Sequence, residues 1–181
     1  PLVASLFLAV LGGCGGSAGE DSKEASPAVS STTDLSTAVV RIVAQGGFQD
    51  PTEGTGVKTG SGSGFIIDPS GLAVTNNHVV TGAATLDVFV AGETKARHAR
   101  ILGTSECSDL AVIDIDGDGF PFLEWADENE IKTGTKVFAA GYPLGDPTFT
   151  LTDGIIAKTE ATAISTVLGP EKAIEHTAKT Q

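Results

Sequence analysis

FIIDPSGLAVTNNHVV, at residues 65–80, predicts a β-hairpin that leads directly into a histidine. Two short apolar runs, residues 65–67 and 72–75, flank the Asp-Pro-Ser-Gly sequence at 68–71, where Pro and Gly occupy positions that tight turns favour. His78 comes just after the second run, where one helical turn fits. The hairpin therefore predicts a strand end that holds an imidazole on a rigid support.

Short β-branched or alternating runs recur along the rest of the chain and predict further strands. The expected strands cover 39–43, 65–67, 72–75, 86–90, 99–102 and 110–113, followed by 136–140, 149–151 and 155–158. Residues 46–64 contain seven glycines and are expected to form a loop. Because no long amphipathic helix is evident, the sequence predicts an all-β fold built as a small barrel or sandwich.

The composition fits one folded domain and argues against a nucleic-acid-binding protein. The chain has 181 residues, of which 40% are hydrophobic, and this is enough to build a core. The formal net charge is −12. A surface this acidic has too few basic groups to neutralise phosphates, so no nucleic-acid partner is expected.

The first residues are typical of an export signal. The apolar run LVASLFLAVL at 2–11 is too short to span a bilayer, which takes about 20 residues as a helix, but it suits the core of a signal peptide. Leu-Gly-Gly at 11–13 precedes Cys14 and resembles the bacterial lipobox. This predicts a signal peptide at residues 1–13 that lacks its cationic start, and a lipid on Cys14. The alternative is a buried apolar strand with an ordinary cysteine.

Residues 14–36 are expected to form a flexible linker between the lipid and the folded domain. The segment consists largely of Ser, Ala, Gly, Glu and Thr, with almost no large apolar residue. Such a composition cannot bury enough surface to order itself.

Asp109 lies in a second motif, Ser-Asp-Leu-Ala-Val at 108–112, about thirty residues after His78. A histidine that acts as a general base needs a carboxylate to fix its tautomer and hold its ring. Two strand ends of one small barrel can supply this pair. Each residue alone has an ordinary structural explanation, the histidine at a strand end and the aspartate as a cap or turn residue.

Taken in order, the motifs resemble the HtrA-type branch of the trypsin-like serine proteases. The similarity covers GSGFII at 62–67, GLAVTNNHVV at 71–80, SDLAV at 108–112, GYPLG at 141–145 and DGIIA at 153–157. The resemblance implies that His78 is the general base and that Asp109 orients it. It also implies a trypsin-like double β-barrel over residues 37–181. The first barrel would be complete at about 37–126, and the second only partly present at about 127–181.

The family's nucleophile is not among the 181 residues, since no Gly-Asn-Ser-Gly-Gly run occurs in them. Residues 174–181 resemble the approach to that run, so we expect the serine within about ten residues after Gln181 and expect the present stretch alone to be inactive. The resemblance implies a bacterial serine endopeptidase of the cell envelope, held to the membrane by the lipid on Cys14 and acting on proteins or peptides, including unfolded ones. The alternative is an inactive, protease-like lipoprotein that only binds peptides.

Several other residues and motifs resemble functional sites but have simpler structural explanations. Asp-Ile-Asp-Gly-Asp-Gly at 114–119 imitates the start of a calcium loop, yet the closing glutamate is out of place and no flanking helices are predicted. A calcium-stabilised structural lipoprotein is therefore the weaker third reading. Cys107 is expected to be a small residue beside a strand, His98 to face solvent, and Ser61 and Ser63 to be loop residues rather than nucleophiles. We predict no metal and no cofactor.

Overall fold

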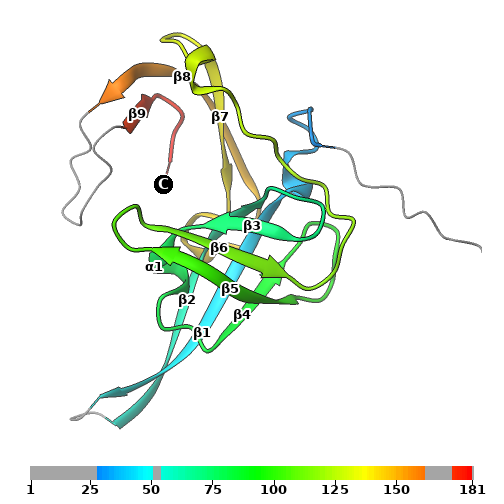
Figure 1. Ribbon diagram of the computed structural model, residues 1–181, viewed down its shortest axis with the longest axis vertical. Helices are drawn as coiled ribbons and strands as arrows, with labels where there is room; N and C mark the ends of the chain where they lie inside the picture. The colour runs from blue at the N-terminus through cyan, green and yellow to red at the C-terminus, as the bar shows by residue number, and fades with distance from the viewer. Residues whose placement is uncertain (1–27, 51–53, 162–172, 181) are drawn as a thin grey trace, which may run out of the picture.

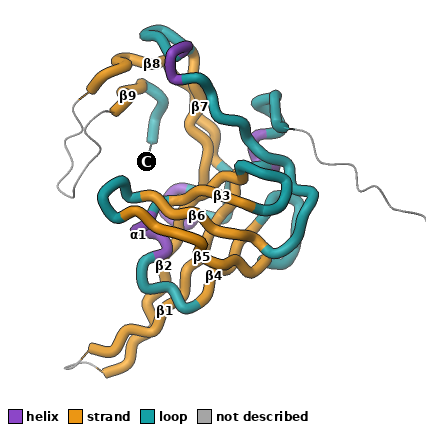
Figure 2. Tube along the Cα trace, in the orientation of Figure 1, coloured by secondary structure: helices purple, strands orange, loops and turns teal. Residues whose placement is uncertain are grey.

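Six antiparallel strands close into a β-barrel, and three more form a separate sheet beside it (Figure 1). The computed structural model describes residues 28–50, 54–161 and 173–180. Helix within these ranges is confined to short turns (Figure 2). None of those helical turns has the length and apolar character needed to cross a bilayer. The predicted all-β fold is confirmed, whereas Cys14 and the predicted signal peptide lie outside the described residues.

The barrel strands close in an order that differs from their order along the chain. They are β1 (Val39–Asp50), β2 (Gly54–Ile66), β3 (Leu72–Thr75), β4 (Thr85–Phe89), β5 (Arg97–Ser105) and β6 (Leu110–Ile115). Their hydrogen-bonded order is β1-β2-β3-β6-β5-β4, with β4 pairing back to β1. The other sheet contains β7 (Lys136–Gly141), β8 (Thr150–Ala161) and β9 (Ala173–His176). The helical turns of the described residues are η1 (Leu35–Thr37), α1 (Asn77–Val80), η2 (Glu128–Glu130) and η3 (Pro143–Gly145).

Alternation along the strands builds the core of the barrel. β4 and β6 bury every second side chain, as expected for a sheet with one face inward. The largest fully buried side chains are Ile42, Ile66, Ile113, Ile115, Val40, Val80 and Val88. The β7-β8-β9 sheet is more open, since Phe138, Leu151 and Ile155 remain exposed. The barrel is therefore the rigid part from which site residues can be held.

The predicted loop at residues 46–64 is wrong, because β1 and β2 continue through it as a paired ribbon. The two strands pair over the whole of β1, and the ribbon extends past the barrel (Figure 1). Glycine weakens a strand locally, but it also allows close approach of a neighbouring element. A Cβ on Gly62 would lie 2.5 Å from the Val79 side chain. Close packing therefore explains Gly62, as it does Gly46, Gly60 and Gly64, which the sequence pattern assigned to a loop.

The two strands predicted at 149–151 and 155–158 are one strand, β8. The sequence pattern left residues 152–154 outside both predicted strands. Gly154 instead lies inside it and is paired with Val137 of β7. A Cβ on Gly154 would run into the backbone of Ala178, so this glycine serves close packing rather than a turn.

Residues 28–36, which the sequence analysis assigned to a flexible linker, include a stretch that contacts the folded domain. Ala28 forms a parallel bridge with Phe122, and the Val29 N–H donates to the Phe122 carbonyl at 2.8 Å. Leu35 then begins η1, which leads into β1. Backbone pairing with a distant segment holds this stretch despite its polar composition.

Candidate active site

His78 lies on α1, the single helical turn that follows β3. Asn76 is still extended, with φ −81° and ψ 145°, so the helical turn starts only after it. Val79 and Val80, from the same turn, are buried in the barrel core. Because these two valines anchor the turn, the imidazole of His78 projects outward, with its side chain 72% exposed.

Asp109 occupies the turn between β5 and β6, where its backbone adopts a left-handed φ of 49°. Aspartate tolerates this conformation better than most residues. The strands β3 and β6 are neighbours in the barrel, with Thr75 opposite Ala111. The end of β3 therefore meets the start of β6, and this juxtaposition brings Asp109 to His78, 31 residues away in the chain.

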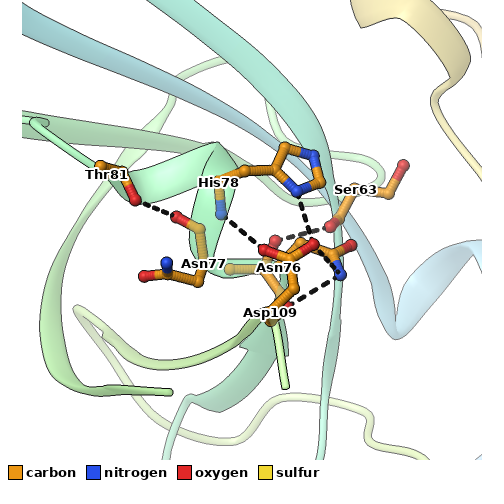
Figure 3. A network of polar contacts seen from close by, with 7 residues as sticks. Ser63, Asn76, Asn77, His78, Thr81 and Asp109 are labelled. Atoms are coloured by element: carbon orange, nitrogen blue, oxygen red, sulfur yellow. Dashed lines mark hydrogen bonds and ion pairs between the residues drawn. The ribbon is translucent and has the colours of Figure 1, made fainter. Parts of the chain in front are cut away.

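The carboxylate of Asp109 holds His78 at two points (Figure 3). Nδ1 of the ring lies 2.7 Å from Oδ2, and the backbone N–H of His78 donates to Oδ1 at 2.9 Å. The Asn76 side-chain amide donates to the Asp109 carbonyl at 3.0 Å and to Oδ2 at 3.3 Å. The Asn77 N–H donates to the same carbonyl at 3.1 Å. The structure therefore brings together the two residues that the sequence singled out and locks their relative orientation.

This arrangement favours an ionised aspartate and one tautomer of the imidazole. Burial alone would raise the pKa of Asp109, but the hydrogen bonds from the backbone and ring of His78 outweigh it, so the pKa lies below its ordinary value of 3.8. An ionised carboxylate can only accept hydrogen bonds. Nδ1 of His78 is therefore protonated and donates a hydrogen bond to Asp109. The lone pair of Nε2 is then free to accept a proton.

Sequence reasoning missed the part played by Asn76. Its side-chain amide donates hydrogen bonds to both the carbonyl and the carboxylate of Asp109. These bonds connect Asp109 to the end of β3, which leads to His78. The available signal was the pair of asparagines before the histidine, because short amide side chains often bond nearby backbone groups.

Ser63 lies close to the His78–Asp109 pair, but its polar groups are engaged elsewhere. Its hydroxyl accepts a hydrogen bond from the Tyr142 N–H at 2.8 Å, and its carbonyl accepts one from the Thr75 hydroxyl at 2.8 Å. Figure 3 shows the hydroxyl pointing away from the imidazole. This geometry supports the prediction that Ser63 is not a nucleophile.

In the calcium-like segment at residues 114–119, two acidic residues interact with arginines. Asp114 pairs with Arg100, and the carbonyl of Asp116 accepts a hydrogen bond from Nη1 of Arg97 at 2.9 Å. Among the residues that the structure describes, no three His, Cys, Asp or Glu side chains converge as metal ligands would. Cys107 is exposed in the turn that precedes Asp109.

A cavity of about 430 Å³ opens beside the strand ends, between the barrel and β7. Ser63, Thr75 and Asn76 lie along one part of its wall, and apolar side chains such as Leu110 and Phe138 form much of the rest. The polar groups around His78 therefore border a largely apolar hollow at the junction of the barrel and the other sheet.

Comparison with known proteins agrees with this geometry. The family of trypsin-like peptidase domains matches residues 62–181, which include both His78 and Asp109. The match covers more than half of the chain, and the chain belongs to this family.

Individual relatives narrow the assignment to one branch. A "probable periplasmic serine endoprotease DegP-like" of Rickettsia conorii is 40% identical over 97 residues, which is 53% of this chain and 19% of that protein. The "serine protease Do-like HtrA" of Bacillus subtilis is 33% identical over 153 residues, covering 81% of this chain and 33% of that protein. The resemblance to the HtrA-type branch is therefore confirmed.

A solved structure shows the same architecture. The HtrA-type protease AlgW with a decapeptide superposes with a TM-score of 0.66 at 26% identity, over 81% of this chain and 50% of that one. The present chain thus spans half of this solved structure, and a fifth to a third of the length of the two curated relatives above.

Proposed function

We propose that the protein is an HtrA-type serine endopeptidase in which His78 is the general base and Asp109 orients it. The observation that carries this proposal is the 2.7 Å contact between Nδ1 of His78 and Oδ2 of Asp109, reinforced by the bond from the His78 backbone to the same carboxylate. An acyl-transfer enzyme needs an imidazole held in one tautomer with Nε2 free, whereas a peptide-binding protein does not.

The reaction proceeds through an acyl-enzyme. A serine hydroxyl attacks the carbonyl carbon of the scissile peptide bond while Nε2 of His78 takes its proton. The C–N bond then breaks, and His78 returns the proton to the leaving amine. Water repeats the sequence on the ester, releasing the carboxylic acid and restoring the serine.

Asp109 acts in this scheme without giving up its charge. Its lowered pKa keeps the carboxylate ionised, so it stabilises the imidazolium that forms when His78 accepts the proton. The Asn76 amide and the His78 N–H keep the carboxylate in place during the transfer. Pre-set hydrogen bonds of this kind avoid reorganisation at the moment of reaction.

The nucleophile is the part of the triad that we place after Gln181. No Gly-x-Ser-Gly-Gly run occurs in the 181 residues, and the Ser63 hydroxyl is committed to Tyr142. On this proposal the 181-residue stretch alone does not hydrolyse peptides, because it contains the base and the orienting acid without a serine that faces them.

Proteins and peptides are the proposed substrates. AlgW, an HtrA-type protease whose solved structure resembles this chain, has been solved with a decapeptide and with a tripeptide. The hollow beside the strand ends, which Asn76 lines, gives apolar side chains of a polypeptide a surface to contact.

The decisive experiment uses the full-length gene product, a fluorophosphonate probe and unfolded casein. We expect the probe to label a serine after Gln181 and to stop casein hydrolysis in proportion to labelling. His78→Ala should abolish both, because the serine then lacks its base. Peptide mapping by mass spectrometry locates the labelled residue.

The same experiment separates the alternative function. A full-length protein that binds casein peptides in fluorescence anisotropy, yet is neither labelled nor active, would be the inactive peptide-binding lipoprotein. Labelling of Ser61 or Ser63 would instead place the nucleophile inside the present chain and contradict the proposed mechanism.

We also propose that the protein works in the bacterial cell envelope, held to the membrane by a lipid on Cys14. Relatives such as that of Rickettsia conorii are named periplasmic, and the apolar run before Cys14 has the length of a signal-peptide core. Mass spectrometry of the mature N-terminus should find a diacylated cysteine, and Cys14→Ser should release the protein from the membrane. An unmodified N-terminus upstream of Cys14 would contradict the anchor.

A further inference from the structure

The segment of β2 from Gly60 to Gly64 alternates glycine and serine, and this alternation gives the strand two different faces. Successive residues of a strand point to opposite sides. One face of the segment consists of glycines, of which Gly60 and Gly62 lie under the His78 turn. The other consists of serines that lie against the turn after β7.

The glycine face allows the helical turn that contains His78 to pack closely against β2. A Cβ on Gly62 would lie 2.5 Å from the Val79 side chain, and a Cβ on Gly60 would lie 3.3 Å from the Val79 carbonyl. A larger residue at Gly62 would therefore push α1 away. Since α1 carries His78, the height of the imidazole above the barrel depends on this face.

The serine face reaches the other sheet. The Ser63 hydroxyl accepts the Tyr142 N–H at 2.8 Å, across 79 residues of sequence. A Cβ on Gly141 would lie 2.7 Å from the same hydroxyl oxygen, so the end of β7 packs directly against Ser63. Tyr142 is itself buried and packs edge-on against Phe149 of the loop before β8.

Ser63 also joins the strand end that leads to His78. Its carbonyl accepts the Thr75 hydroxyl at 2.8 Å, and Thr75 is the last residue of β3. Thr75 is the one buried polar side chain of the described residues. A single residue thus bonds to the catalytic strand end through its backbone and to the second sheet through its side chain.

We propose that Ser63 is a positioning residue. It fixes the position of the sheet that contains β7 and β8 relative to the His78–Asp109 pair. This inference rests on the proposed peptidase function. There the nucleophile comes from residues that follow the second sheet, so its distance from Nε2 depends on how that sheet is seated on the barrel. Misplacement of a catalytic group by a fraction of an ångström lowers the rate without changing the groups that react.

The test measures phosphonylation and peptide hydrolysis by the full-length protein, each per active site. Active sites are counted by end-point labelling with a fluorophosphonate. We expect Ser63→Ala to lower both the phosphonylation rate constant and kcat by about tenfold, with KM little changed. A methyl group leaves the Tyr142 N–H without its acceptor, so the turn shifts.

Three variants control this result. Ser63→Thr keeps the acceptor and should restore both rates to within about twofold of wild type. Gly141→Ala perturbs the same contact from the opposite side and should slow both reactions as Ser63→Ala does, which keeps the test open if one variant folds poorly. Thr85→Ala removes an exposed hydroxyl from β4, a strand that does not pair with β7, and should leave both rates unchanged.

The failure of this inference is distinguishable from failure of the proposed function. Ser63→Ala with wild-type rates per labelled site, alongside an inactive His78→Ala, would overturn the role of Ser63 and leave the peptidase intact. Equal losses in Ser63→Ala and Ser63→Thr would also overturn it, because the acceptor would then be irrelevant. An active His78→Ala would instead remove the peptidase mechanism on which the inference rests.

Discussion

Within the described residues, the barrel carries two histidine–aspartate pairs, and they differ in how the backbone takes part. His78 and Asp109 come from two strand ends, with Nδ1 and Oδ2 2.7 Å apart. His98 and Asp87 face each other across β5 and β4, with Nδ1 and Oδ1 3.5 Å apart. The two histidine side chains are similarly exposed, at 72% and 77%, so exposure of the imidazole does not distinguish the pairs. The solvent-facing position predicted for His98 is confirmed.

The backbone makes the difference. Asp109 accepts a hydrogen bond from the N–H of the very residue whose ring it orients, and its own carbonyl accepts the Asn77 N–H. The carboxylate and the imidazole therefore cannot rotate independently. The Asp87 carboxylate is engaged by side chains, those of His98 and of Gln45 at 3.2 Å. An exposed pair held by side chains alone contributes little, so a defined base requires the first arrangement.

Removing each histidine should give the widest separation between the pairs. His78→Ala in the full-length protein should lower kcat by about 10⁶-fold, because the general base is lost. His98→Ala should leave kcat within about twofold of wild type. Hydrolysis of unfolded casein, with circular dichroism to verify folding, measures both. Similar losses in the two variants would show that the backbone contacts do not decide which pair is catalytic.

The aspartates should show the same contrast at a smaller scale. Asp109→Asn should lower kcat by about 10⁴-fold, because an amide can donate to Nδ1 and favour the wrong tautomer. Asp87→Asn is the matched control and should be active to within about twofold. Initial rates at saturating casein provide the comparison. An Asp109→Asn protein with more than a tenth of wild-type kcat would argue that the aspartate only shapes the turn.

These contrasts also show what the sequence can and cannot predict. The strands that flank His78 and Asp109 were predictable because apolar alternation, turn residues and motif order all agreed. The contribution of Asn76 was not, because an asparagine side chain has many local partners and only the fold selects Asp109. Gly60, Gly62 and Gly64 of β2 were misread as loop residues, and Gly154 of β8 was left outside the predicted strands. Their role is close packing against distant segments, and local propensity contains no information on such contacts.

Two glycine substitutions compare the packing beneath the two histidine–aspartate pairs, one near His78 and one on the strand that carries His98. Gly62→Ala should destabilise the fold by about 2 kcal/mol, because the new Cβ has to displace the valine beside His78. Gly103 lies on β5, the strand that carries His98, and a Cβ there would meet no atom within 4 Å. Gly103→Ala should therefore change stability by less than about 0.5 kcal/mol. Urea denaturation of both variants measures this, and equal stabilities would mean that α1 is not seated on the glycine face.

The smallest effect concerns the ionisation of Asp109 and asks which donor holds its carboxylate. The wild-type pKa lies below the ordinary 3.8, through hydrogen bonds from the backbone and ring of His78, the charge of His78 and the Asn76 amide, against the opposing effect of burial. His78→Ala removes the ring but keeps the backbone N–H of residue 78. We therefore expect the pKa of Asp109 to rise in this variant only part of the way, and in Asn76→Ala to rise less. Carboxyl ¹³C titration of Asp-labelled protein measures each value.

The same lowered pKa predicts the direction of a pH effect on stability. Folding favours the ionised form of Asp109, so its contribution is fully present above the unfolded value near 3.8 and is lost as the pH falls through the lower folded value. Wild type should accordingly lose more stability between pH 5 and pH 2 than Asp109→Asn, which has no carboxylate to protonate. A wild-type Asp109 that titrates at or above 3.8, or two proteins with the same acid dependence, would show that the backbone contacts do not favour the charged carboxylate. The distinction between the two histidine–aspartate pairs would then rest on distance alone.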